Sequence, residues 1–346
     1  SWELLDEVER AAFSQLSVFA GGFTLEAAEA VLLLDRPVLD VIQSLREQSL
    51  VHAMYRGPRG GPLRLALYES LREYAGQQLE HQQREELQGR HARFYLERAR
   101  RWAASAMGRD AEHAIGRLAE EMPNILAVHR RARGEDEVRA LETLTHLWPM
   151  IAYRGGFDAF ARVLRESLAA VTAAGSDPVA LRARICLADM LRLAGRVQEA
   201  RLVLAEMAEP PADPLRRAEY HRVEAETLLR VGETAAAVTR FAEAAKLYEA
   251  SGDLAAHGFL LGRLGRAQAA AAQTDLAWQT LGRAVELART HGNRRVQVQA
   301  VLGQASVKMQ QGKVTEAVED YRFVAQAADQ LGDRYLEGLA SMNLCT

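Results

Sequence analysis

The second half of the chain carries small and apolar residues in a pattern with a period of 40 positions. The pairs Gly252-Asp253, Gly292-Asn293 and Gly332-Asp333 are each 40 residues apart, and each pair precedes a helical pattern. The segment Gly175-Ser176-Asp177 opens a unit of the same kind. A period of this length is typical of repeat proteins, in which a unit buries its apolar face only by stacking on its neighbours. The pattern predicts a stack of helical hairpins over residues 173–346, with the last one truncated.

A second landmark recurs within each unit, where a small residue at a turn is followed by apolar residues 5, 9 and 12 positions later. Glycine permits a tight reversal between antiparallel helices, and the first of the three apolar positions is alanine, which lets the helices approach closely. We expect the larger apolar side chain to fill the space between neighbours. The four sets are Gly195 with Ala200, Leu204 and Met207; Gly232 with Ala237, Phe241 and Ala244; Ala272 with Ala277, Leu281 and Ala284; and Gly312 with Ala317, Tyr321 and Val324.

Residues 1–82 follow a different pattern, in which helical stretches precede two short apolar stretches joined by a Gly/Pro-rich segment. Such a segment between two short apolar stretches is typical of a β-hairpin. Three helices, a hairpin and a further helix are the order of a winged helix, which we expect here. The predicted elements are helices over about 4–13, after the N-cap residue Thr24 and over 36–48, strands over 50–55 and 63–67, and a helix over 68–80.

Residues 83–172 are helical throughout and form a predicted connector of atypical repeats. The expected helices cover about 84–106, 110–131, 136–153 and 157–173. The fold class is therefore mostly all-α: a small winged-helix domain and then an α-α superhelix of helical hairpins. Both ends of the sequence fall inside helical patterns, so we expect the chain to be a piece of a larger protein.

Composition and charge narrow the classes of partner. The 43 Lys and Arg residues and 46 Asp and Glu residues give a net charge of -3, so no overall basic field attracts nucleic acid or an anionic membrane. No apolar run approaches the length that crosses a bilayer, and the first residues given do not show the pattern of a signal peptide. Cys186 and Cys345 lie too far apart to indicate a disulfide framework. We expect a cytoplasmic protein without a membrane partner.

The repeat spacing resembles the tetratricopeptide repeat in its long variety of about 40 residues. The small residue of the first helix in that family is present as Ala188, Ala225, Gly265 and Ala305. The leucine that precedes it is present in the first and third units, whereas Glu224 and Gln304 replace it in the others. In such repeats the first helix of each pair lines the concave surface.

The first domain resembles a more specific family, the bacterial signal-transduction ATPases with numerous domains (STAND). The similar stretches are residues 1–6, 16–28, 49–51 and 71–75, with Leu16-Ser17-Val18-Phe19-Ala20-Gly21-Gly22-Phe23-Thr24 the most distinctive, and Glu121-Met122-Pro123-Asn124-Ile125-Leu126-Ala127 is similar to a helix that those regulators carry before their repeats. The resemblance implies an upstream ATPase module on which the winged helix packs. It also implies that the repeats sense a ligand or partner, and that a separate effector supplies the output.

Motifs for catalysis and cofactor binding are absent from the sequence. A phosphate-binding loop ends in Gly-Lys-Ser/Thr, but the one Gly-Lys pair, Gly312-Lys313, is followed by Val314 at a repeat turn. The nine histidines lack the spacing of metal ligands, and no dinucleotide fingerprint or nucleophile elbow occurs. We therefore predict no enzymatic activity and no cofactor in this chain.

The candidate ligand site is the concave face of the repeats. Six arginines occur at the positions that line it in tetratricopeptide proteins, and an arginine fork suits the carboxylates of an acidic peptide or protein segment. The alternative is that these arginines solubilise the face or pair with Asp189, Glu219 and Glu226. The residues at the lining positions are Arg182, Asp189, Arg192, Glu219, Arg222, Glu226, Arg230, Phe259, Arg263, Arg266, Gln299, Ser306, Met309 and Gln310.

The predicted hairpin carries a second group of basic residues. No acidic residue lies between Glu47 and Glu69, so contact with a DNA backbone is conceivable. The helix that would enter the groove carries Asp40 and Glu47 and few side chains suited to base edges, which favours contact with the ATPase module or with solvent instead. The candidate contact residues are His52, Arg56, Arg59 and Arg64.

Three functions are compatible with these patterns. The leading hypothesis is the ligand-sensing and protein-interaction part of a signal-transduction or transcription regulator. Its repeats would bind a peptide, protein or small effector, and its winged helix would couple to the ATPase. The alternatives are a winged-helix DNA-binding regulator with a repeat dimerisation arm, and a passive repeat scaffold.

Overall fold

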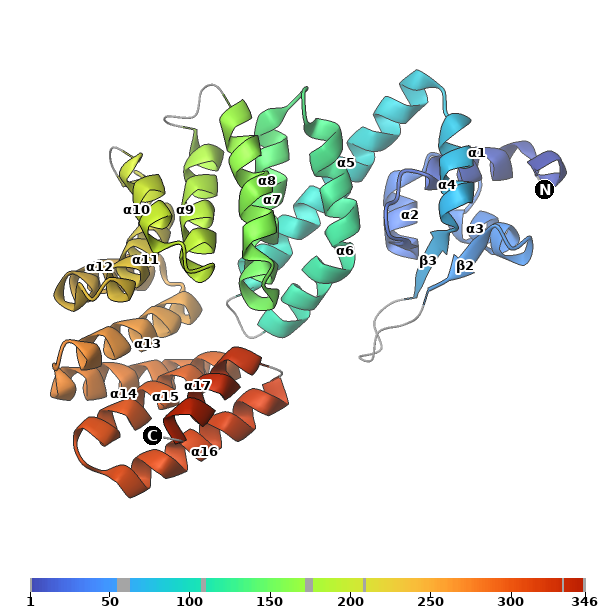
Figure 1. Ribbon diagram of the computed structural model, residues 1–346. Helices are drawn as coiled ribbons and strands as arrows, with labels where there is room; N and C mark the ends of the chain where they lie inside the picture. The colour runs from blue at the N-terminus through green and yellow to red at the C-terminus, as the bar shows by residue number, and fades with distance from the viewer. Residues whose placement is uncertain are drawn as a thin grey trace. The chain divides into compact units, whose positions relative to one another are not determined.

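The computed structural model describes residues 2–54, 63–106, 110–171, 177–207, 210–331 and 333–344. Most of these residues are helical, which confirms the predicted mostly α-helical class (Figure 1). The chain divides into two compact units. Unit 1 comprises Ser1–Ala104 and Ile115–Met150, and unit 2 comprises Ser105–Ala114 and Ile151–Thr346. This division departs from the predicted boundaries at 82 and 172, because most of the helical connector belongs to unit 1.

Unit 1 begins with short helices around a small sheet. Asp6 starts α1 through a capping box, in which the Asp6 and Glu9 side chains each accept a hydrogen bond from the other residue's backbone N–H. Thr24 caps α2 as predicted, because its hydroxyl accepts from the Ala27 N–H. The elements are a 3-10 helix Trp2–Leu4, α1 Glu7–Leu16, β1 Phe23–Thr24, α2 Leu25–Val31, α3 Val38–Glu47, β2 Val51–Ala53, β3 Arg64–Leu67 and α4 Glu69–Gln77.

The sheet has the strand order β1-β3-β2 and is antiparallel. Val51 pairs with Leu67, which confirms the predicted hairpin, whereas its tip at 55–62 is outside the described residues. The pairing of Phe23 with Leu65 was not predicted, because a two-residue strand is too short to show an alternating pattern. Phe13 and Phe23 are almost fully buried in the core of this region.

Three longer helices follow: α5 His81–Ser105, α6 Ala111–Ala132 and α7 Glu137–Arg154. Their bounds agree within a few residues with the helices predicted in the connector. Apolar side chains such as Leu118, Leu141 and Leu144 are fully buried. The last turn of α7 belongs to unit 2.

Unit 2 is a tetratricopeptide-like α-α superhelix, as predicted. Each helix from α8 onward packs on the next, and the first helices of neighbouring hairpins also touch, α9 on α11 and α13 on α15. The helices are α8 Phe157–Ala170, α9 Pro178–Leu193, α10 Val197–Ala205, α11 Pro214–Arg230, α12 Thr234–Ser251, α13 Leu254–Ala270, α14 Thr274–Thr290, α15 Arg294–Gln310, α16 Val314–Leu331 and α17 Arg334–Leu344.

The turns between paired helices use the left-handed backbone region. Gly195, Gly232 and Gly312 have φ of 81°, 83° and 76°, which glycine adopts without steric cost. Ala272 occupies the same position with φ 59°. An alanine in this conformation costs about 1 kcal/mol because its Cβ approaches the backbone, so the third hairpin keeps its turn against the local preference of its sequence.

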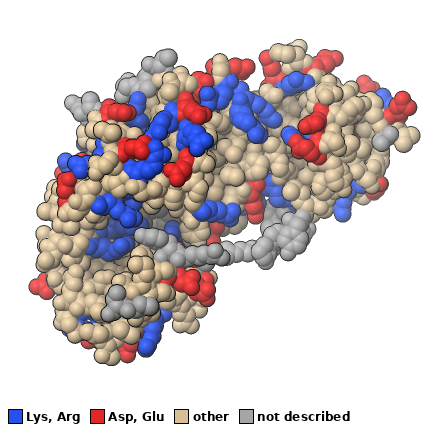
Figure 2. All heavy atoms as spheres, viewed as in Figure 1, with Lys and Arg blue, Asp and Glu red and all other residues tan. Residues whose placement is uncertain are grey.

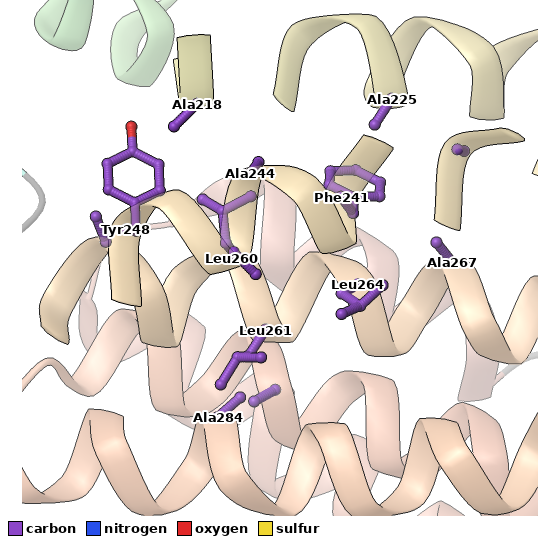
Figure 3. Close-up of a cluster of buried hydrophobic side chains, with 14 residues drawn as sticks. Ala218, Ala225, Phe241, Ala244, Tyr248, Leu260, Leu261, Leu264, Ala267 and Ala284 are labelled. Carbon is purple, nitrogen blue, oxygen red and sulfur yellow. The ribbon is translucent and has the colours of Figure 1, made fainter. Parts of the chain in front are cut away.

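The repeat core confirms the predicted roles of the residues at offsets 5, 9 and 12. Phe241 and Tyr248 of α12 lie between the small residues of α11 and the leucines of α13 (Figure 3). Ala237, Phe241 and Ala244 are fully buried. The small residue of the first helix also has a clear reason: a Cβ on Gly265 would lie 2.5 Å from Cγ of Leu281, which is fully buried.

Candidate ligand-binding site

The first helices of three successive hairpins, α9, α11 and α13, carry charged side chains one helical turn apart. Asp189 and Arg192 are three positions apart on α9, and Arg222 and Glu226 are four positions apart on α11. Residues at these spacings share one face of a helix. Together with Arg263 and Arg266 of α13 they form what we call the arginine cluster. Figure 2 shows Lys and Arg atoms gathered over α11 and α13.

Aspartate caps set the starts of these three helices and so the register of their faces. Asp177 accepts from the N–H groups of Val179 and Ala180 at the start of α9. Asp213 accepts from the Arg216 N–H at the start of α11, and Asp253 accepts from the Ala256 N–H at the start of α13. The capped ends fix where each helix begins, and the helical period then places the charged residues on one face.

Asp189 is the central acceptor of the cluster and is 3% exposed. Arg192 donates to its Oδ1 from Nη2 at 2.6 Å and from Nε at 2.9 Å, and Arg222 Nη2 donates to Oδ2 at 2.8 Å. Burial alone would raise the pKa of Asp189, but Arg222 and Arg192 outweigh it and hold the pKa at about 2. The carboxylate is therefore ionised at neutral pH and neutralises part of the charge of both arginines.

Glu226 is the second carboxylate of the cluster. It lies 3.6 Å from Arg192 Nη1 and 3.3 Å from Arg263 Nε, and its side chain is 9% exposed. Glu226 Oε1 and Arg263 Nε are both buried, yet neither makes a hydrogen bond to another described residue. Their contact is thus an ion pair without hydrogen-bond geometry. The Arg263 guanidinium also lies over the Phe259 ring, 5.1 Å from its centroid.

Arg266 differs from the other arginines of the cluster. No hydrogen bond or ion pair joins its guanidinium to another residue in the described part of the chain, although the side chain is half-buried. Its stem lies against α15, where a Cβ on Gly303 would come within 3.1 Å of Arg266 Cγ. Burial lowers the pKa of Arg263, and Arg266, Arg192 and Arg222 lower it further against the opposing effect of Glu226. The cluster therefore holds excess positive charge around Arg263 and Arg266.

The remaining predicted lining residues fall outside this cluster. Arg182 is half-buried near the start of α9, Arg230 is exposed at the end of α11, and Gln299 is half-buried on α15. Glu219 pairs with Arg216 at 2.8 Å. The residues of α15 have local roles: Ser306 donates to the Leu302 carbonyl and accepts from the Tyr321 hydroxyl, Met309 packs in the apolar core, and Gln310 donates to the Ala269 carbonyl.

One residue that belongs to the site was not predicted from the sequence. Gly303 makes room for the Arg266 stem, and a glycine inside a helical pattern is a signal for such close approach.

The candidate contact residues of the predicted hairpin lie in different surroundings. Arg64 lies in the body of unit 1, because its guanidinium pairs with buried Glu121 of α6 and donates to the carbonyls of Gly21 and Gly22. His52 stacks on Tyr68, with ring centroids 4.3 Å apart. Arg56 and Arg59 are outside the described residues.

Two of the stretches that resemble signal-transduction ATPases, residues 16–28 and 121–127, meet inside unit 1. Asn124 accepts from the Ala20 N–H at 2.7 Å and donates to the Gly22 carbonyl at 2.9 Å. A Cβ on Gly21 would lie 2.7 Å from Cβ of Pro123, so only glycine allows this approach. The resemblance in both stretches thus corresponds to one packed contact between α6 and the segment before α2.

His91 of α5 completes this contact and is fully buried. Its Nε2 lies 3.4 Å from Asn124 Oδ1 and its Nδ1 lies 3.5 Å from Arg131 Nη1. Both contacts are satisfied when Nε2 carries the proton and Nδ1 accepts from Arg131. Burial, with Arg131 beside the ring, lowers the pKa of His91 to about 3.

Unit 1 is expected to lose stability in mild acid through His91. The pKa in the folded chain is below the ordinary 6.5, so the unfolded chain takes up the proton first and stability falls as the pH drops from 6.5 toward 3. The expected loss is about 1.4 kcal/mol per pH unit within this window. Urea unfolding at pH 7, 6 and 5 measures it in a Trp278→Phe chain, whose remaining tryptophans, Trp2, Trp102 and Trp148, all lie in unit 1.

The control for this prediction is the His91→Gln chain, because glutamine donates and accepts but does not titrate. Buried His129, whose pKa is also lowered by burial, is present in both chains and so cancels in the comparison. An equal pH slope with and without His91 contradicts the assignment.

Across the described ranges, no group of three or more His, Cys, Asp or Glu side chains lies close enough to hold a metal ion. Among the helices described here, none is long and apolar enough to span a bilayer.

Comparison with known proteins gives structural matches. No protein-family model matches the sequence, and no curated protein matches it. A STAND protein with a tetratricopeptide repeat sensor from Pyrococcus horikoshii matches 98% of the chain, with TM-score 0.59 and 17% identity. The chain spans about half of that protein, 53%. A Rap protein in complex with Competence and Sporulation Factor matches 92% of the chain and 82% of its own length, with TM-score 0.50 and 12% identity.

A third match is a kinesin light chain with tetratricopeptide-like repeats from Podosopora anserina. It has 19% identity and TM-score 0.46, and it covers 57% of this chain and 98% of its own. At such identities the matches with the STAND and Rap proteins show the fold alone, which agrees with the superhelix of unit 2.

Proposed function

We propose that this chain is the ligand-sensing and protein-interaction part of a cytoplasmic signal-transduction or transcription regulator. Its repeats bind a peptide or protein segment on the face that the first helices form. The helix-and-hairpin region at the start of unit 1 acts as a winged helix that couples this binding to an ATPase module outside the chain.

The observation that carries the proposal is the arginine cluster on the first helices of successive repeats. Its charges are held in a fixed arrangement by Asp189 and Glu226, and the donors of Arg263 and Arg266 are not used in hydrogen bonds with other described residues. A preorganised surface with unused donors loses little entropy when it binds a polar ligand. The fold it shares with a tetratricopeptide repeat sensor is consistent with this role.

The coupling role rests on the contact between α6 and the segment before α2. Arg64, Glu121 and Asn124 connect β3, α6 and the backbone around Gly22, so this region is held to the helices that lead toward the repeats. A ligand shifts a switch only by binding one of its states more tightly. A region held to those helices can pass that preference on.

DNA binding is less well supported than ligand binding. Arg64 uses its donors within unit 1, and no observation on the described residues favours a groove contact. The passive scaffold has no specific observation in its favour either.

Selection from a displayed library of random octapeptides tests the proposal on the full chain. We expect enriched peptides that bind with one-to-one stoichiometry in calorimetry. We also expect slower hydrogen exchange in α11 and α13 when such a peptide is bound, because binding suppresses local opening there. A scrambled peptide of the same composition is the control. The proposal is wrong when no peptide is enriched or when protection is confined to unit 1.

A further inference from the structure

The charges of the arginine cluster do not balance. The cluster contains four arginines, Arg192, Arg222, Arg263 and Arg266, and two carboxylates, Asp189 and Glu226, which leaves an excess of two positive charges. Half-buried positive charges repel one another more strongly than they would in water, because the surrounding protein screens them less. An arrangement of this kind is stabilised when an anion joins it.

The excess is not spread evenly over the cluster. Arg192 and Arg222 direct three hydrogen bonds to Asp189, at 2.6 to 2.9 Å, and the pKa of each is raised by the carboxylates despite burial. Arg263 has instead a lowered pKa, and among the described residues it has only the ion pair with Glu226 and the Phe259 ring as partners. The unbalanced charge is therefore on α13.

Arg263 and Arg266 are three positions apart on α13, so they lie on one face of that helix. Phe259, one turn earlier, lies beneath the Arg263 guanidinium, and Gly303 lets the Arg266 stem lie close to α15. These two contacts hold the stems of both side chains while their N–H groups remain without hydrogen bonds to the residues that the structure describes. Two such forks can take a carboxylate with several charge-assisted hydrogen bonds.

We propose that Arg263 and Arg266 together bind a carboxylate of the peptide that the repeats recognise, and that Arg192 and Arg222 position them without touching the ligand. This inference rests on the proposed function and adds the chemical group that is recognised. The carboxylate comes either from an acidic side chain or from the peptide C-terminus. Glu226 is the competing partner, because it already pairs with Arg263 at 3.3 Å.

The test uses peptides enriched from the octapeptide library, displayed once with a free C-terminus and once as an internal loop. We expect Asp or Glu to be enriched at one position in the loop format, or a preference for the free C-terminus. In synthetic peptides, changing that residue to Asn or Gln, or amidating the C-terminus, should weaken binding to the natural chain about tenfold or more. The same change should have little effect on binding to the Arg266→Gln chain, because its partner is already missing.

Two further chains serve as controls. Arg266→Lys keeps the charge without the fork and should recover part of the affinity. Arg289→Gln removes an exposed arginine from α14 and should bind like the natural chain. Thermal unfolding of each chain separates a loss of binding from a loss of folding.

The outcomes distinguish the carboxylate anchor, by which we mean carboxylate binding by Arg263 and Arg266, from the proposed function. Enriched peptides that bind equally well with and without their carboxylates, or equally to the Arg266→Gln chain, overturn the anchor and leave peptide binding in place. A library that yields no binder overturns both. Peptides whose carboxylate and Arg266 show a shared, non-additive loss of affinity support the anchor.

Discussion

Replacing Asp189 with asparagine is expected to lower the free energy of unfolding of unit 2 by about 3 kcal/mol. The aspartate is 3% exposed and receives three hydrogen bonds from Arg192 and Arg222. Removing its charge leaves two arginines in a poorly solvated position with only Glu226 to offset them. Hydrogen exchange in α9 and α11 measures the effect, because it reports the free energy of local opening in these helices.

The pH dependence of this effect has a definite sign. The Asp189 pKa is about 2 in the folded chain against an ordinary value of 3.8, so its contribution is complete above pH 3.8 and is lost as the pH falls toward 2. The asparagine chain should lack this part of the acid response. Glu233→Gln is the matched control, because its ion pair with Arg201 is about half exposed and should contribute less than about 1 kcal/mol. Equal effects of the two substitutions would contradict a structural role for Asp189.

The Arg64→Ala substitution is expected to destabilise unit 1 by about 3 kcal/mol or more. Glu121 is 3% exposed and would lose its nearest cation, while the carbonyls of Gly21 and Gly22 would lose a donor. Arg117 lies 3.7 Å from the same carboxylate and offsets only part of the loss. Tryptophan fluorescence during urea unfolding of the Trp278→Phe chain reports this change in unit 1 alone.

Two comparisons make the Arg64 prediction specific. Arg72→Ala removes an arginine whose partner, Glu69, is 70% exposed, so the expected loss is below about 1 kcal/mol. Adding Glu121→Gln to the Arg64→Ala chain should recover part of the stability, because the buried unpaired charge is removed. A loss below 1 kcal/mol for Arg64→Ala would show that its guanidinium is not held as described. It would also restore Arg64 as a candidate for contact with a partner.

The helices and turns of residues 173–346 could be predicted in detail, because the residues that specify them lie close together in the sequence and recur in each repeat. The offset from Gly232 to Phe241 recurs in every unit, so each unit supports the interpretation of the others. The turn glycines were identified by position, and the structure confirms their left-handed backbone. Ala272 falls at the same position of its repeat as these glycines, because the same offsets lead to Ala277 and Leu281. Its Cβ nevertheless disfavours the left-handed backbone conformation that it adopts.

The helices and strands of unit 1 could be predicted from the sequence. The contacts that join its distant segments could not. The helices, the hairpin and the Thr24 cap follow from short patterns in residues 1–82. The packing of α6 on the segment before α2 joins residues about 100 positions apart, such as Ala20 and Asn124. No helical period encodes such a contact, so the pattern along the chain does not predict that α6 packs on the segment before α2.

The sequence by itself determined which residues share a helix face, because the helical period and the aspartate caps act within a few residues of one another. The resemblance of the repeat spacing to tetratricopeptide repeats then predicted that arginines and carboxylates would line the first helices of the repeats. Only the tertiary structure decided which arginine pairs with which carboxylate. Asp189 reaches Arg222, Glu226 reaches Arg263, and Arg266 has no such partner among the described residues, because those pairings depend on how neighbouring helices are offset and rotated in the stack.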